Sequence, residues 1–161
     1  MYNSGSIRTA LERALEVAHG YLENLKAMSV APTVDLATLR TRFANPLNEE
    51  STARAVVIAD LAGHVDGGIV GSASGRFFGW AIGGTLPSAM AADWLVSARD
   101  QNAALLSCGP AAAVVEEVVR SWLKDLLGLP SSASFALTTG CQMAHITCLA
   151  AAHHSLLARL G

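Results

Sequence analysis

Residues 76–130 decide the fold of this chain, and they read RFFGWAIGGTLPSAMAADWLVSARDQNAALLSCGPAAAVVEEVVRSWLKDLLGLP. Pro87 and Pro110 each suit the first turn of a helix, where a missing backbone N–H costs nothing. Gly128 followed by Pro130 is a strong helix stop signal. The stretch therefore predicts two helices, over residues 87–106 and 110–127.

The rest of the chain adds further helices and one short strand. Apolar residues recur at helical spacing near the N-terminus, and Asn45-Pro46 breaks the chain before Asn48, a good helix cap. Gly140 turns the chain into its last helix. The expected helices cover residues 6–28, 35–43, 48–62 and 141–160, with a loop at 66–75 and a strand at 135–138. The fold class is mainly α.

The composition indicates a chain whose apolar faces are covered by other protein. Hydrophobic residues make up 52% of the chain, charged residues only 15%, and the mean hydropathy is +0.38. An ordinary domain is about a quarter charged. Residues 126–158 lack Asp, Glu, Lys and Arg, but Gly128, Pro130 and several polar residues interrupt the run. No apolar window of about 20 residues remains to span a membrane.

Charge and cysteine content exclude several functional classes. The net charge is −2, the isoelectric point is near 6.2, and lysines and arginines are scattered, so no nucleic acid or anionic membrane partner is expected. Cys108, Cys141 and Cys148 make an odd number without metal-type spacing. The N-terminus lacks the apolar core of a signal peptide. These features predict a cytoplasmic protein with free thiols.

The junction at Thr138-Thr139-Gly140 is the best chemical candidate. The unpaired amides of a helix N-terminus carry partial positive charge, so a phosphate group can bind there without a cationic side chain. A glycine lets the backbone approach such a group closely. The residues alone fit a plain turn between strand and helix as well.

Other clusters have simpler explanations. Three aromatics beside glycines at residues 76–84 are typical of core packing as well as of a pocket wall. Glu116 and Glu117 point about 100° apart on a helix, so they do not converge on one substrate atom. Cys141, His145 and Cys148 share a helical face, but no fourth ligand is evident, and no metal site is predicted.

Three groups of residues carry a resemblance to a known family. They are the motifs DWL at 93–95, DQN at 100–102 and WLKDLLGLP at 122–130. Residues 76–152, and more weakly the chain back to about residue 45, resemble the N-terminal part of group II pyridoxal-phosphate-dependent amino-acid decarboxylases, which include the aromatic amino acid and glutamate decarboxylases.

The resemblance implies a fold-type-I (aspartate aminotransferase-like) enzyme that is a homodimer, binds pyridoxal 5′-phosphate and acts on an amino acid. This chain would be its truncated N-terminal segment and the start of its large α/β domain. Residues 1–75 would form a helical dimerisation segment, 76–130 a pocket wall and helices, and 131–161 the start of the cofactor-binding domain.

The resemblance also assigns site residues. The family turn T-G-G-T-x-A-N corresponds to residues 139–145 here, so Gly140, Cys141 and Gln142 would bind the cofactor phosphate. Cys141 stands where a small residue is usual and Gln142 where a hydroxyl is usual. Trp80 and Ile82 would line the substrate pocket.

The Schiff-base lysine is missing from this pattern. Lys26 and Lys124 are the lysines of the sequence, and neither has the His-Lys context of the family. No catalytic residue is assigned, and the chain alone is expected to be inactive. Two alternatives stay open: a non-catalytic helical dimerisation module, and another fold-type-I lyase of the aldolase or sphingosine-phosphate type.

Overall fold

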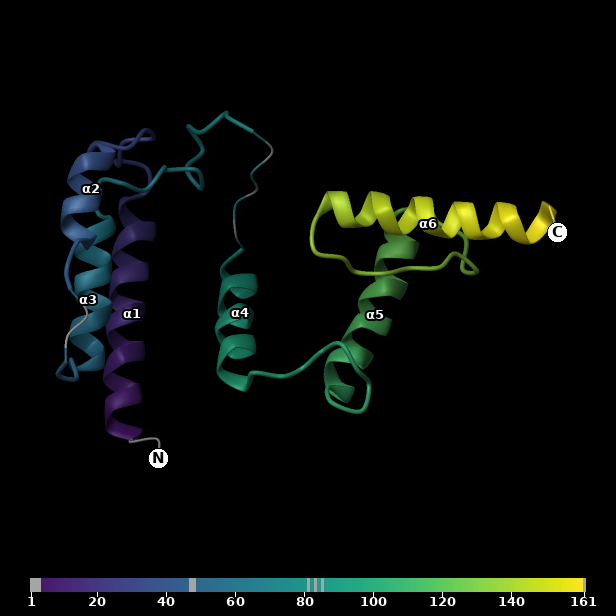
Figure 1. The fold of residues 1–161 in the computed structure, drawn as a ribbon, viewed down its shortest axis with the longest axis horizontal. Helices are drawn as coiled ribbons and strands as arrows, with labels where there is room; N and C mark the ends of the chain where they lie inside the picture. Colours follow the sequence, from purple (N-terminus) through teal and green to yellow (C-terminus); the bar gives the residue numbers. More distant parts are fainter. Residues whose placement is uncertain (1–3, 47–48, 81, 83, 85, 161) are drawn as a thin grey trace. The chain divides into compact units, whose positions relative to one another are not determined.

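The chain folds into helices joined by loops (Figure 1). The computed structural model describes residues 4–46, 49–80, 82, 84 and 86–160. Within these residues the elements are α1 (Ser4–Asn24), α2 (Leu36–Phe43), α3 (Arg54–Val65), α4 (Pro87–Arg99), α5 (Pro110–Leu126) and α6 (Cys141–Leu160). The mainly α class is confirmed.

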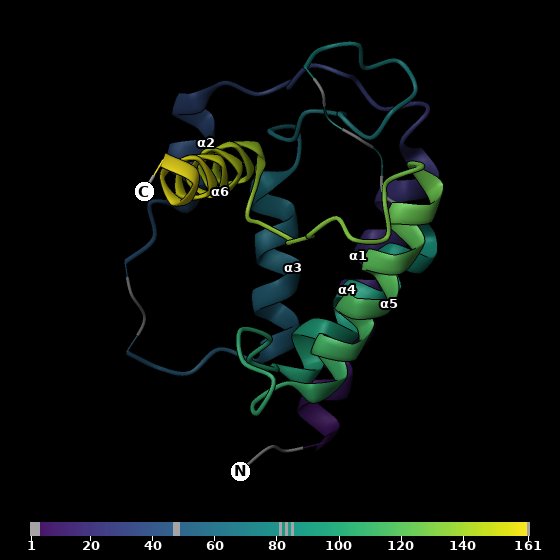
Figure 2. The ribbon, with the colours of Figure 1, turned by 90° about the vertical axis from the view of Figure 1, so that its right-hand side faces the viewer.

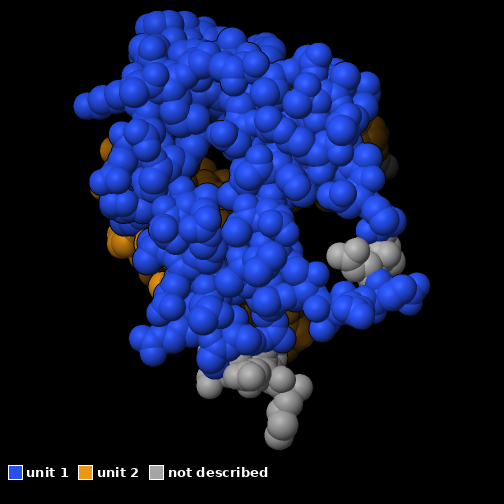
Figure 3. Space-filling model, turned by 90° about the vertical axis from the view of Figure 1, so that its left-hand side faces the viewer, with its two compact units in different colours: residues 1–90 blue, residues 91–161 orange. Residues whose placement is uncertain are grey.

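The chain divides into two compact units (Figure 3). Unit 1 comprises residues 1–90 and unit 2 comprises residues 91–161. The boundary lies inside α4. The sequence predicted three segments, 1–75, 76–130 and 131–161, which are defined by function and not by compactness. That division stays a prediction.

In unit 1, α1 and α3 pack side by side and run in the same direction (Figures 1 and 2). At their first turns the Arg54 guanidinium donates a hydrogen bond to the Ser6 hydroxyl. Part of the apolar stripe expected on α1 lies toward α3, where Ala14 and Ala18 line the shared side together with Tyr21. The leucines of that stripe, Leu11, Leu15 and Leu22, stay exposed. Small residues on this stripe leave a groove between the helices.

Helix α2 packs on the last turn of α3. The rings of Phe43 and His64 meet edge to face, with centroids 5.3 Å apart and planes at 72°. The Arg42 guanidinium donates to the carbonyl oxygens of His64 at 3.3 Å and Asp66 at 2.6 Å. A cation thus satisfies carbonyl groups that the end of a helix leaves without partners.

The Asp35 carboxylate caps α2. It accepts a hydrogen bond from the Thr38 amide at 2.8 Å, which lowers the pKa of Asp35 below its ordinary 3.8. Because the pKa of Asp35 is lower in the folded chain, the cap stabilises α2 at pH values above the pKa of Asp35 in the unfolded chain. This stabilisation is lost as the pH falls through the lower pKa of the folded state.

We therefore expect α2 to fray as acid protonates Asp35. In an NMR pH titration, the Thr38 amide should shift with a midpoint below 3.8. An Asp35→Asn variant, which keeps an acceptor but cannot titrate, should lack that step. A wild-type midpoint above 3.8 would contradict the cap.

The segments that follow α1 and α3 bond to each other. The Thr33 and Val34 amides donate to the Gly67 carbonyl at 2.7 and 3.2 Å, and the Gly71 amide donates to the Val30 carbonyl at 3.0 Å. Gly67 has φ +72°, a conformation that favours glycine. These bonds order the expected loop at 66–75.

Helix α5 ends as the sequence predicts, whereas α4 is shorter than expected. The prediction placed the end of α4 near residue 106, but it ends at Arg99 because Asp100 has φ +45°. Asn102 then accepts the Ala104 amide at 3.1 Å. Asp and Asn side chains compete with helical bonding in this way.

Two other expectations are corrected. Residues 135–138 are not a strand, and no strand occurs in the described part of the chain. A strand needs a hydrogen-bonding neighbour, which a lone segment lacks. Helix α3 begins at Arg54 and continues through Gly63 to Val65, whereas the sequence suggested residues 48–62. The expected cap, Asn48, lies outside the described residues.

The helices leave most apolar side chains exposed. Among the described residues none of the hydrophobic side chains is buried, and Ser74, 8% exposed, is the buried polar residue. No helix in the described ranges is long and apolar enough to cross a membrane. An isolated domain normally buries most of its large apolar side chains, so exposure on this scale indicates that other protein covers them.

Candidate functional site: a glycine turn at the start of helix α6

Gly140 forms the turn into α6. It has φ +94°, its amide donates to the Thr138 carbonyl at 3.0 Å, and its own carbonyl accepts the Ala144 amide at 3.2 Å. A Cβ placed on Gly140 would have no heavy atom within 4 Å. The glycine is therefore required by backbone conformation, and the space beside it is open.

Cys141 and Gln142 occupy the first turn of α6, and both are exposed. The amides of a first turn have no carbonyl partner within their own helix, and the helix dipole gives them partial positive charge. Acidic residues are absent from this turn, so no carboxylate opposes an anion. The geometry suits a phosphate group bound by backbone N–H groups.

The aromatic segment preceding α4 belongs to unit 1. The rings of Phe77 and Trp80 lie 6.3 Å apart at an interplanar angle of 54°, and Trp80 is 84% exposed with φ +51°. Ile82 is 49% exposed. Both side chains are exposed in unit 1, and their expected role in a substrate-pocket wall stays a prediction.

Arg76 anchors this aromatic segment. Its guanidinium donates to the Met28 carbonyl, its amide donates to the Ser74 hydroxyl at 3.2 Å, and the Phe77 amide donates to the Ser74 carbonyl at 3.0 Å. The start of the segment is thereby tied to the turn that follows α1.

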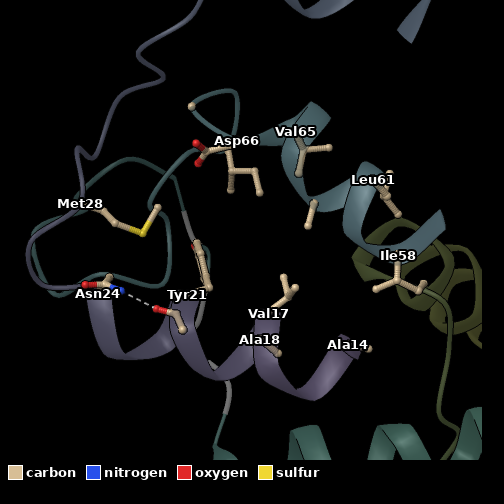
Figure 4. Close-up of a pocket in the computed structure, with 14 residues that line it drawn as sticks. Ala14, Val17, Ala18, Tyr21, Asn24, Met28, Ile58, Leu61, Val65 and Asp66 are labelled. Atoms are coloured by element: carbon tan, nitrogen blue, oxygen red, sulfur yellow. Dashed lines mark hydrogen bonds between the residues drawn. The ribbon is translucent and has the colours of Figure 1, made fainter. Parts of the chain in front are cut away.

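Unit 1 also contains a groove that the sequence interpretation did not single out (Figure 4). It lies between α1 and α3, has a volume of about 670 Å³, and is mainly apolar. Asn24 and Asp66 lie at one end, where the side-chain Nδ2 of Asn24 donates to the Gly20 carbonyl at 2.9 Å. The signal available in sequence was the run of small residues at Ala14, Ala18 and Gly20 on the inner face of α1.

No group of His, Cys, Asp and Glu in the described residues could hold a metal ion. Cys141 and Cys148 are exposed free thiols on α6.

Comparison with known proteins gives one informative similarity. The chain is 26% identical over 130 residues to tryptophan decarboxylase 1 of Oryza sativa subsp. japonica. The aligned region covers 81% of this chain and 25% of that protein, so the chain spans about a quarter of its relative's length. No protein-family model and no solved structure matches. The chain is thus distantly similar to an amino-acid decarboxylase.

Proposed function

We propose that this chain is the N-terminal portion of a pyridoxal-phosphate-dependent amino-acid decarboxylase of fold type I. It contributes dimerisation helices, part of the pocket wall, and the turn that binds the cofactor phosphate. The observation that carries the proposal is Gly140, open and left-handed at the start of α6. The decarboxylase similarity supports the same reading, because it extends over most of the chain.

The residues present fit the phosphate end of the cofactor. Gly140 gives close backbone access, and the amides of Cys141 and Gln142 supply donors at the positive end of the α6 dipole. When bound, pyridoxal phosphate supplies an electron sink for the carbanion that loss of CO₂ leaves. The chain's own part is to bind and orient the cofactor through its phosphate.

The residues present do not fit the carbonyl end of the cofactor. A lysine must bind that group covalently. The Lys124 ammonium already donates to two backbone carbonyls in unit 2. Lys26 lies in the turn after α1, in unit 1. The chain alone is therefore proposed to bind the phosphate without catalysing decarboxylation.

The exposed helix faces support the proposed homodimer and the wider assembly. Leu11, Leu15 and Leu22 of α1 are all exposed although α1 packs on α3. Helix α6 has Arg159 as its one charged side chain among 20 residues when histidine is neutral, and its side chains Ile146, Leu149, Leu156 and Leu160 are exposed. A helix of this kind is normally enclosed by other protein.

A second candidate function is a non-catalytic helical dimerisation module. The packed pair α1 and α3, with its apolar groove, favours it. Such a module would sediment as a compact, folded dimer without any cofactor and would show no affinity for phosphate compounds.

The test compares pyridoxal phosphate with pyridoxal. We expect the purified chain to bind the phosphorylated compound, inorganic phosphate to compete with it, and pyridoxal to bind at least about tenfold more weakly, because charge-assisted bonds to phosphate are lost. Incubation with cofactor and L-tryptophan or other amino acids should release no CO₂. Equal affinity for both compounds would contradict the phosphate role, and stoichiometric CO₂ release would contradict the predicted inactivity.

A further inference from the structure

Helix α5 ends in a tight chain reversal built from two backbone bonds. The Leu129 amide donates to the Lys124 carbonyl at 2.9 Å, and the Gly128 amide donates to the Asp125 carbonyl at 3.1 Å. Gly128 has φ +64°. This is the Schellman arrangement, in which a left-handed glycine closes the helix. It directs the chain back past the last turn of α5.

The side chain of Lys124 then crosses the reversal. Its ammonium donates to the carbonyl of Ser131 and, at 3.2 Å, to the carbonyl of Ala133. The Ala133 amide donates to the Pro130 carbonyl at 2.9 Å. Lys124 is partly buried, unlike most side chains of unit 2. Lys124 thus holds the reversal in two ways. Its backbone carbonyl accepts the Leu129 amide, and its ammonium donates to the carbonyls of the segment that follows.

We infer that Lys124 is a positioning residue for the segment that leads to the glycine turn. By holding Ser131 and Ala133 against the end of α5, it fixes where residues 134–140 start and so restricts the placement of Gly140. The same bonds occupy the ammonium donors, so Lys124 is a structural cation and not an amine for the cofactor carbonyl. The part concerning cofactor affinity rests on the proposed function.

A lysine suits this position for a physical reason. Its ammonium is a compact group with three donors on a flexible stem, so it can reach two carbonyl oxygens. Methionine has a similar length but no donor. Arginine keeps the charge and several donors in a planar fork, so it should restore part of the restraint.

The test is amide hydrogen exchange in the full chain, without ligand. In Lys124→Met, the amides of Ala133 and Gly140 should exchange about tenfold faster, because hydrogen bonds from a charged donor are lost. The Gly128 and Leu129 amides should keep their rates, since their acceptors are carbonyls of α5, which do not depend on the Lys124 ammonium. Lys124→Arg should recover part of the protection. Unchanged rates at Ala133 and Gly140, or equal acceleration at all four amides, would overturn the positioning role.

A second measurement separates this inference from the proposed function. Affinity for pyridoxal phosphate should fall in Lys124→Met and return in part in Lys124→Arg. If the wild-type chain binds no pyridoxal phosphate, the proposed function is wrong, while the exchange rates still decide whether Lys124 positions the segment. If binding is strong and unaffected by Lys124→Met, the link from Lys124 to the turn is wrong.

Discussion

Replacing Gly67 by alanine is expected to destabilise unit 1 by about 3 kcal/mol, the largest effect of any single substitution considered. The left-handed φ of +72° is unfavourable for alanine. The added Cβ would also lie 2.7 Å from the Thr33 hydroxyl and 3.2 Å from a Val34 methyl group. The Gly67 carbonyl accepts hydrogen bonds from the Thr33 and Val34 amides. Displacement of Gly67 would therefore break the hydrogen bonds between the segments that follow α1 and α3.

The readout is hydrogen exchange at the Thr33 and Val34 amides, which should accelerate about a hundredfold. Gly63→Ala is the matched control, since Gly63 lies within α3 and a Cβ there meets no atom within 4 Å. That variant should gain about 0.5–1 kcal/mol of stability. Similar exchange rates in Gly67→Ala and the wild type would show that the pairing does not depend on this glycine.

Gly140→Ala should weaken binding of pyridoxal phosphate by tenfold or more. The left-handed conformation costs a non-glycine residue about 1–2 kcal/mol, and relief of that strain would re-aim the first amides of α6. No side-chain clash contributes, because the site of the Cβ is open. The effect therefore reports the backbone conformation of the turn and nothing else.

Gly128→Ala provides the control for this second substitution. Gly128 also has positive φ, +64°, and open space at its Cβ, but it closes α5. Both variants should lose similar stability, whereas Gly140→Ala should lose clearly more affinity, because Gly128 acts on the turn only indirectly, through the chain reversal that precedes residues 134–140. Equal loss of affinity in the two variants, measured by equilibrium dialysis, would mean that general destabilisation and not the turn governs binding.

Local signals in the sequence were sufficient wherever a helix end depended on its own residues. Pro110 and Gly128 set the limits of α5, and Gly140 set the start of α6, because proline fixes φ and glycine readily adopts the positive φ that these turns need. The start of α2 is local as well, because the Asp35 side chain caps it by accepting the Thr38 amide.

The errors arose where competing local bonds or absent neighbours decided the outcome. The spacing within α4 continued past Arg99, but Asp100 and Asn102 adopt a turn of their own. Residues 135–138 have strand composition without a partner strand. β-propensity describes how a residue fits between neighbours, so it cannot create a strand alone.

The candidate site was predictable in one part only. The glycine turn needs a single residue with positive φ, and Gly140 provides it. The groove between α1 and α3 depends on how two separate helices pack, which spacing within one helix does not specify. The same limit applies to Trp80 and Ile82, whose role as a pocket wall stays a prediction.

The most direct test of the central claim is an amide-resolved NMR titration of the chain with pyridoxal phosphate and, separately, with pyridoxal. The account predicts that pyridoxal phosphate shifts the amides of Gly140, Cys141 and Gln142 first and most strongly, and that pyridoxal leaves them unchanged. Shifts confined to other residues, or equal shifts with both compounds, would contradict a cofactor-phosphate site at the start of α6.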